Sequence, residues 1–234
     1  MKYLGGKAKV ARHIAPFIDA ELLVRGHLVE PFVGGFNLVP SLRCAASAEC
    51  SDVHAGLIAL LKAVQSGAVM PDELSEHEYA RLRFVEDWSD PLTAFAAFGC
   101  SFGGKEWGGY ARGQGSTGPR NYAAESSRLL QTKRRSMAGV VFRCSNYQSL
   151  APASCVVYCD PPYRGTTGYK TGAFDYAAFY AWCEAAARRN CAVFVSEFTA
   201  PPHWTVLWSR ERKISVSGMK DSLSKTETLY KVTP

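Results

Sequence analysis

Apolar residues along the chain gather in blocks separated by glycine, proline and polar turns. Short blocks, typical of strands, lie at about residues 27–33, 47–53, 140–146, 154–163, 191–198, 204–212 and 226–232. Longer blocks with apolar spacings of three and four, typical of helices, lie at 55–67, 71–87, 91–100, 123–138 and 174–190, with a further short helix expected after residue 35. This alternation predicts an α/β fold with a mostly parallel sheet and helices on both faces.

The stretch from about 67 to 135 interrupts the alternation with helices and a glycine-rich segment, GGKEWGGYARGQGSTGPRNY, that we expect to be mostly loop. We therefore expect a core of residues 1–66 and 136–234 with an inserted subdomain at 67–135. Asp72 or Ser75 should begin one helix of the insertion, and Asp175 should begin the helix after the fourth core strand.

Composition restricts the class of protein. The chain has 234 residues, of which 47% are hydrophobic and 21% charged, so disordered and fibrous classes are excluded. No apolar run approaches the roughly 20 residues needed to span a bilayer, and the first residues do not resemble a signal peptide, so we expect a cytoplasmic protein. The eight cysteines contain no C-x-x-C pair, which favours buried core thiols over a metal or redox site.

The positive charge is concentrated in one window. The net charge is +6, and residues 103–145 hold eight basic against two acidic residues, so the rest of the chain is neutral. Trp107, Tyr110 and Tyr122 stand among these cations. Arginine and lysine neutralise phosphates and aromatic faces stack on bases, so a nucleic-acid partner is one interpretation and a solvated basic loop is the other.

Two strand ends carry candidate chemistry. In EPFVGGF the first strand runs into Gly34 and Gly35, and the second strand ends in Asp52. In a doubly wound sheet this pattern favours a nucleoside site, with backbone amides and a carboxylate within reach of ribose hydroxyls. The alternative is an ordinary turn.

The second candidate is VVYCDPPY, where Asp160 ends a buried strand and Pro161, Pro162 and Tyr163 turn the chain. Open α/β sheets bind ligands at this edge. The carboxylate and a turn carbonyl could accept hydrogen bonds from an amino group, and the Tyr163 ring could face a planar base. A rigid proline turn without function is the alternative.

Taken together, these motifs resemble the adenine-specific DNA methyltransferases of the Dam type. The resemblance runs through nearly the whole chain in a fixed order: YLGGK, VEPFVGG, SDVHAGLIALL, CDPPY and TETLYKV. The segment GGKEWGGYAR is similar to the version found in phage-borne members. The resemblance implies a Rossmann-like class I methyltransferase core that binds S-adenosyl-L-methionine.

The resemblance also implies roles for particular residues. The cofactor-contacting positions would be Tyr3, Lys7, Asp52 and Asp160, with Glu30, Phe32, Gly34 and Gly35 beside the methionine part. Phe36 and Asn37 follow Gly35 where many members have a fuller glycine pattern. The catalytic turn would be Asp160, Pro161, Pro162 and Tyr163, acting on a base flipped out of duplex DNA.

The insertion lies where this family keeps its target-recognition region. Candidate DNA contacts are Lys105, Arg112, Arg120, Lys133, Arg134 and Arg135, together with Tyr169 and Lys170 in the loop after the catalytic turn. The five histidines show no metal-ligand spacing, so we expect no metal and read the histidines as incidental. The expected partner is double-stranded DNA, with no membrane, and the protein itself would be a monomer or weak dimer.

Other interpretations stay open at this point. The same fold could act on cytosine amino groups, on RNA or on a protein glutamine, although the aspartate in DPPY favours adenine by resemblance. A non-catalytic DNA-binding relative is a different class. The biological role could be host marking, a restriction-modification system or protection of a phage.

Overall fold

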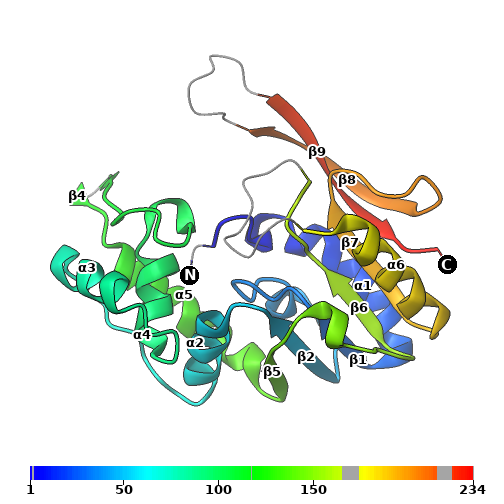
Figure 1. Ribbon diagram of the computed structural model, residues 1–234, viewed down its shortest axis with the longest axis horizontal. Coiled ribbons are helices and arrows are strands. Elements are labelled where there is room, and N and C mark those ends of the chain that lie inside the picture. Colours follow the sequence, from blue (N-terminus) through cyan, green and yellow to red (C-terminus); the bar gives the residue numbers. More distant parts are fainter. Residues whose placement is uncertain (2, 117, 165–173, 215–222, 234) are drawn as a thin grey trace. The chain divides into compact units, whose positions relative to one another are not determined.

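We analysed a computed structural model of the protein, which describes residues 1, 3–116, 118–164, 174–214 and 223–233. The helices are α1 (Ala11–Arg25), α2 (Ala55–Gln65), α3 (Glu76–Val85), α4 (Pro91–Ala94), α5 (Tyr122–Arg134) and α6 (Tyr176–Arg188) (Figure 1). The strands are β1 (His27–Glu30), β2 (Ser47–Asp52), β3 (Gln114–Gly115), β4 (Gly118–Pro119), β5 (Val140–Cys144), β6 (Val156–Cys159), β7 (Ala192–Glu197), β8 (Thr205–Ile214) and β9 (Leu223–Lys231).

Seven of the described strands form one sheet in the order β5-β2-β1-β6-β7-β9-β8, and β3 and β4 form a separate hairpin. β6 pairs in parallel with β1 and β7, whereas β9 pairs antiparallel with β7 and β8. The first five sheet strands therefore follow the doubly wound order, third, second, first, fourth, fifth. The last strand along the chain is inserted beside the fifth in the opposite direction. This arrangement confirms the expected α/β fold with a Rossmann-like class I methyltransferase core.

Most expected elements are confirmed, and the exceptions have local causes. The apolar pattern did not predict α1, which contains Pro16. The short helix expected after β1 is only a 3-10 turn, Val39–Ser41, which contains Pro40. The helix expected at 91–100 begins as α4 and continues as a π-helical segment, Phe95–Gly99.

By its contacts the chain divides into two compact units. The first unit comprises residues 1–12, 33–41 and 50–145, and the second comprises 13–32, 42–49 and 146–234. Within the first unit α2 contacts α4, α5 and β5, and α3 also contacts α4. The predicted separation of a core from an insertion at 67–135 stays a prediction.

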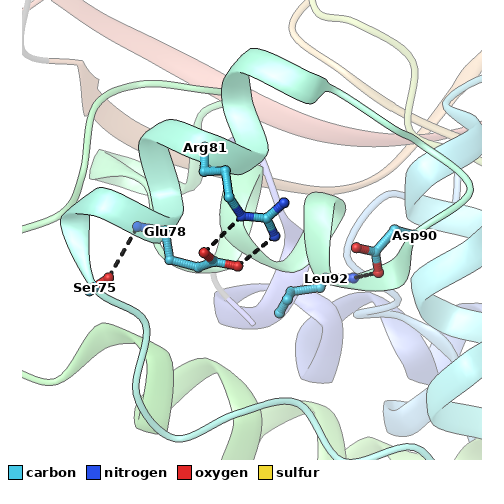
Figure 2. Close-up of polar contacts among 5 residues, drawn as sticks. All are labelled: Ser75, Glu78, Arg81, Asp90 and Leu92. Carbon is cyan, nitrogen blue, oxygen red and sulfur yellow. Dashed lines mark hydrogen bonds and ion pairs between the residues drawn. The ribbon is translucent and has the colours of Figure 1, made fainter.

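Side-chain caps explain where the helices of the first unit begin. The Ser75 hydroxyl accepts a hydrogen bond from the Glu78 amide at 3.1 Å, which confirms Ser75 as the start of α3 (Figure 2). The Glu78 carboxylate in turn binds the Arg81 guanidinium through two hydrogen bonds. At α4 the Asp90 carboxylate accepts from the Leu92 amide at 2.9 Å. These caps satisfy amides that have no partner inside the helix.

The core of the second unit explains the position of its candidate motif. All residues of β6 and β7 are buried. Phe179, Cys183 and Ala186 form one face of α6, which lies against β7, and pack into the same cluster. The DPPY turn therefore leaves a fully buried strand at its carboxyl end.

Two expectations from composition can be compared with the structure. Six cysteines are buried as expected, but Cys144 is exposed and Cys44 is half-buried. Cys144 is the last residue of β5, on the same face as buried Val140 and Phe142, and is exposed at the end of the strand. None of the helices in the described ranges is both long and apolar enough to cross a membrane.

Candidate functional site

In the first unit, a carboxylate closes the glycine turn that follows β1. The Gly34 amide donates to Asp52 Oδ2 and the His54 amide to Oδ1, each at 3.0 Å. Burial raises the pKa of Asp52 above its ordinary value, and these amide bonds oppose the shift. Because a carboxylate offers about four acceptor sites, Asp52 can still accept hydrogen bonds from a ligand hydroxyl.

The side chain of Tyr3 covers this turn. Gly34 has φ +45°, and a Cβ atom added there would lie 2.7 Å from Tyr3 Cε1. A Cβ atom at Gly35 would lie 2.9 Å from Tyr3 Cβ. The Tyr3 ring also contacts Phe98, with ring centroids 5.4 Å apart. The turn therefore requires glycine both for its backbone conformation and for the close approach of Tyr3.

Burial accommodates the phenylalanine that follows the glycine pair. Phe36 has φ +51°, a left-handed conformation that costs a non-glycine residue about 1–2 kcal/mol. Its side chain is fully buried and packs against Phe142, with centroids 5.4 Å apart. Burial of a phenylalanine side chain contributes about 1.5–3 kcal/mol, which offsets the strain. The turn thus keeps its shape with a phenylalanine in this position.

Two lysines support the backbone around the turn. Lys7 is only 4% exposed, and its Nζ donates to the Gly5 carbonyl at 3.3 Å, so its side chain lies in the interior. Lys133 Nζ donates to the Gly35 carbonyl and to Asn37 Oδ1, both at 2.7 Å. A phosphate contact by Lys133 stays a prediction.

His54, read from the sequence as incidental, has a structural role. Its ring Nδ1 accepts from the Leu57 amide at 3.3 Å and so begins α2. The ring lies edge-on to Trp88 at 4.5 Å and to Phe98 at 5.1 Å. Burial lowers the pKa of His54, which favours the neutral ring that this cap needs. The absence of metal-ligand spacing around His54 thus gave no indication of this structural role.

In the second unit, the DPPY turn is held by side chains from remote segments. The Tyr163 hydroxyl donates to Glu227 Oε1 at 3.2 Å, and its ring lies edge-on to Phe198 at 4.6 Å. The Tyr176 hydroxyl donates to the Pro162 carbonyl at 2.8 Å. Within the described ranges no group donates to the Pro161 carbonyl. Asp160 stands half-buried directly after β6.

Three carboxylates of the second unit are buried. Glu30, Glu197 and Glu227 are each at most 3% exposed. Burial, followed by the negative charge of Asp160, raises the pKa of the Tyr163 hydroxyl well above its ordinary value, so the phenol stays neutral. Among the described residues no three His, Cys, Asp or Glu side chains are arranged to hold a metal ion.

The pattern of the sequence did not single out Glu197 and Glu227. Glu197 accepts from the Arg164 amide at 2.6 Å and from the Phe198 amide, and it thereby holds the chain that leaves the DPPY turn. Burial raises the pKa of Glu197. The signal for Glu197 was present, because AVFVSE ends a buried strand in an acid just as VVYCD does. Glu227 lies within a strand and carried no such signal.

The structure divides the predicted site residues between the units. Tyr3, Lys7, Gly34, Gly35 and Asp52 belong to the first unit, and Glu30, Phe32, Asp160, Pro161, Pro162 and Tyr163 belong to the second. The Phe32 ring packs into an aromatic cluster with Tyr147, Phe174 and Phe179, at centroid distances of 5.5–6.0 Å.

The predicted DNA contacts differ in their surroundings. Arg112 pairs with Glu76, and Arg120 forms a two-bond pair with Glu125. The exposed members are Lys105, Arg112, Arg134 and Arg135. Tyr169 and Lys170 lie outside the described residues.

Trp107 is not an exposed ring that could stack on a base. It is 7% exposed, its Nε1 donates to Glu86 Oε1 at 2.9 Å, and its ring contacts Tyr79 and Trp88. The glycine-rich segment is tied down at other points as well, because the Tyr110 hydroxyl donates to the Leu74 carbonyl at 2.7 Å.

Comparisons with known proteins add structural likenesses at low identity. No protein-family model matches the chain, and no curated protein sequence matches it either. Similar solved structures include a "putative methyltransferase" from Escherichia coli (14% identity, TM-score 0.40, 95% of this chain and 84% of that chain). A second is a "putative RNA methyltransferase" from Pyrococcus horikoshii (9% identity, TM-score 0.43, 95% of this chain and 81% of that chain). A third is a "putative methylase" from Haemophilus influenzae (10% identity, TM-score 0.38, 95% of this chain and 88% of that chain). With TM-scores this low, the fold assignment rests on the strand order of the chain itself.

Proposed function

We propose that the protein transfers a methyl group from S-adenosyl-L-methionine to the exocyclic N6 amino group of adenine in duplex DNA. The observation that carries the proposal is the DPPY turn at the end of β6. Tyr176 and Glu227 bind residues of this turn, and the Asp160 carboxylate and the Pro161 carbonyl stand at its start. Two acceptors in sequence are suited to the two hydrogens of an amino group.

The first unit offers residues that fit the cofactor. Asp52 keeps acceptor capacity for ribose hydroxyls while its two amide bonds hold the turn at Gly34 in place. When bound, S-adenosyl-L-methionine supplies a methyl group on a cationic sulfur, which is an excellent leaving group. Asp52 and the turn at Gly34 and Gly35 would bind and orient the nucleoside and methionine parts.

The adenine amino group is a poor nucleophile because its lone pair is delocalised into the ring. Hydrogen bonds to the Asp160 carboxylate and the Pro161 carbonyl would localise this lone pair and orient it. The cofactor would supply its methyl group to this nitrogen in one displacement and leave as S-adenosylhomocysteine, and the released amino proton would pass to water. The contribution of the chain is alignment and electrostatic preorganisation.

The target adenine must leave the base stack to reach this turn, because its amino group is paired inside a duplex. The Tyr163 ring would stack on the extruded base. Its bond to Glu227 holds the hydroxyl end of the ring, and its edge-on contact with Phe198 restricts rotation of the ring. The exposed cations of the first unit, Lys105, Arg134 and Arg135, would contact phosphates and so supply affinity without sequence preference.

The decisive experiment expresses the protein in cells that lack adenine methylation and reads modified bases in genomic DNA by single-molecule sequencing. Methyladenine confined to one short motif would support the proposal and supply the target sequence. No methyladenine from soluble protein that S-adenosylhomocysteine stabilises against heat would overturn the DNA substrate. RNA from the same cells would then be read in the same way.

Asp160→Ala tests the mechanism. At saturating cofactor this variant should lose on the order of 10²–10³ in methylation rate, by analogy with removal of one preorganised transition-state hydrogen bond. Asp72→Ala removes an exposed carboxylate from the loop before α3 and should keep the full rate. An active Asp160→Ala protein would refute the assigned role of this carboxylate.

A further inference from the structure

An open depression of about 380 Å³ lies beside the DPPY turn in the second unit. It is lined by Arg164, Phe198, Thr199, Lys225 and Thr226. These residues come from three segments: the residue after Tyr163, the chain after β7, and β9. The proposed function so far assigns no role to any of them.

Both cations of the depression are positioned on aromatic rings. The Arg164 guanidinium lies over the Tyr176 ring at 5.0 Å, and Lys225 Nζ lies over the Phe198 ring at 4.9 Å. Within the described ranges no carboxylate forms an ion pair with either side chain. A ring orients a cation without neutralising it, so both charges are available to an anion.

The acids nearby are buried and already bonded. Leu229, Glu227 and Lys225 lie on one face of β9, because every second residue of a strand shares a face. The exposure of their side chains increases from fully buried Leu229 to half-buried Lys225. Glu227 accepts from Tyr163, and Glu197 accepts from two amides. The open end of the depression therefore presents two positive charges, the side chains of Arg164 and Lys225, which are suited to a phosphate group.

We infer that this depression binds a backbone phosphate of the DNA strand that carries the target adenine. The inference rests on the proposed function. Arg164 follows Tyr163 directly in the chain. The Phe198 ring contacts both the Lys225 ammonium group and the Tyr163 ring. A phosphate held here is thereby placed next to the ring on which the extruded base would stack. The contact fixes the register of the strand and carries no base preference.

The test compares the wild type with the double variant Arg164→Gln/Lys225→Gln. Binding of a short mixed-sequence DNA duplex is measured over a range of salt concentrations, together with methylation kinetics on genomic DNA. Because the double variant loses the contact with one phosphate, its slope of log K against log salt should be less steep than that of the wild type by about 0.9. We expect a dissociation constant about tenfold higher at low salt, a raised KM for DNA, and unchanged binding of S-adenosylhomocysteine.

Arg188→Gln is the matched control, because Arg188 is an exposed arginine of the same unit that pairs with Glu184 on α6. It should leave the salt slope unchanged. If the double variant melts at a lower temperature than the wild type, the single variant Lys225→Gln replaces it and should show about half of the slope change.

The outcomes separate the two proposals. A wild type that methylates adenine, with a double variant that keeps the wild-type salt slope, overturns this inference alone. A wild type that neither binds duplex DNA nor methylates it overturns the proposed function as well. Inorganic phosphate is the remaining probe: if it stabilises the wild type but not the double variant while DNA binding stays equal, the depression holds a free anion and the inference is refuted.

Discussion

Replacing Gly34 by alanine should cost more stability than the backbone conformation of this residue explains. The new Cβ atom would lie 2.7 Å from Tyr3 Cε1 and 3.2 Å from Tyr3 Cδ1. The Tyr3 ring would have to move away from Phe98 or the turn would have to open. Gly139→Ala is the matched control, because Gly139 also has a positive φ (+73°) but has nothing within 4 Å of the added atom.

The expected magnitudes follow from these two environments. A left-handed alanine costs about 1–2 kcal/mol at either position. Overpacking against Tyr3 adds about 1–3 kcal/mol at Gly34 only, for a total of about 2–5 kcal/mol. In a Tyr3→Ala background the extra cost at Gly34 should disappear, which gives a coupling of about 1–3 kcal/mol between the two positions.

Urea unfolding followed by circular dichroism measures these free energies, and thermal melting checks them at about 2–4 °C for each kcal/mol. Equal costs for Gly34→Ala and Gly139→Ala would refute the contact between Tyr3 and the turn. So would a cost at Gly34 that persists after Tyr3 is truncated.

Two further predictions concern single side chains. Ser75→Ala removes the cap of α3 and should lower the free energy of unfolding, measured by urea titration, by about 1 kcal/mol. Asp72→Ala, at an exposed position, should change this free energy by less than about 0.5 kcal/mol. Equal effects of the two substitutions would contradict the cap. Affinity for S-adenosylhomocysteine, measured by calorimetry, should fall on acidification through the Asp52 pKa, which burial raises above the usual aspartate value, because a protonated carboxyl loses acceptor sites. The Asp52→Asn variant should show a flat profile, and a wild-type profile equally flat would remove Asp52 from the cofactor site.

The raised pKa of Asp52 also makes folding stability depend on pH. Its folded-state pKa is raised, so the folded protein holds this proton more tightly than the unfolded chain. The associated stabilisation is complete below the unfolded pKa and is lost as the pH rises through the folded pKa. As the pH rises through the Asp52 pKa, cofactor affinity should therefore increase while folding stability decreases.

Much of the fold was readable from local patterns. The strands, the helix starts at Ser75 and Asp175 and the turn after β6 depend on periodicity, caps and proline, which act within a few residues. The pattern failed at α1, because Pro16 lacks the amide that a helix interior needs. Burial of Ile14, Ile18 and Leu22 along one face stabilises that helix despite the proline.

The tertiary structure decided which partners the side chains contact. By itself the sequence identified Asp52 and Asp160 as acids that end strands, and Gly34 as part of a turn. It did not indicate that Tyr163 binds Glu227, 64 residues away, or that Lys133 binds the Gly35 carbonyl, 98 residues away. Such partners depend on strand order and register, which bring remote segments together, whereas local patterns carry information only about the residue's own element.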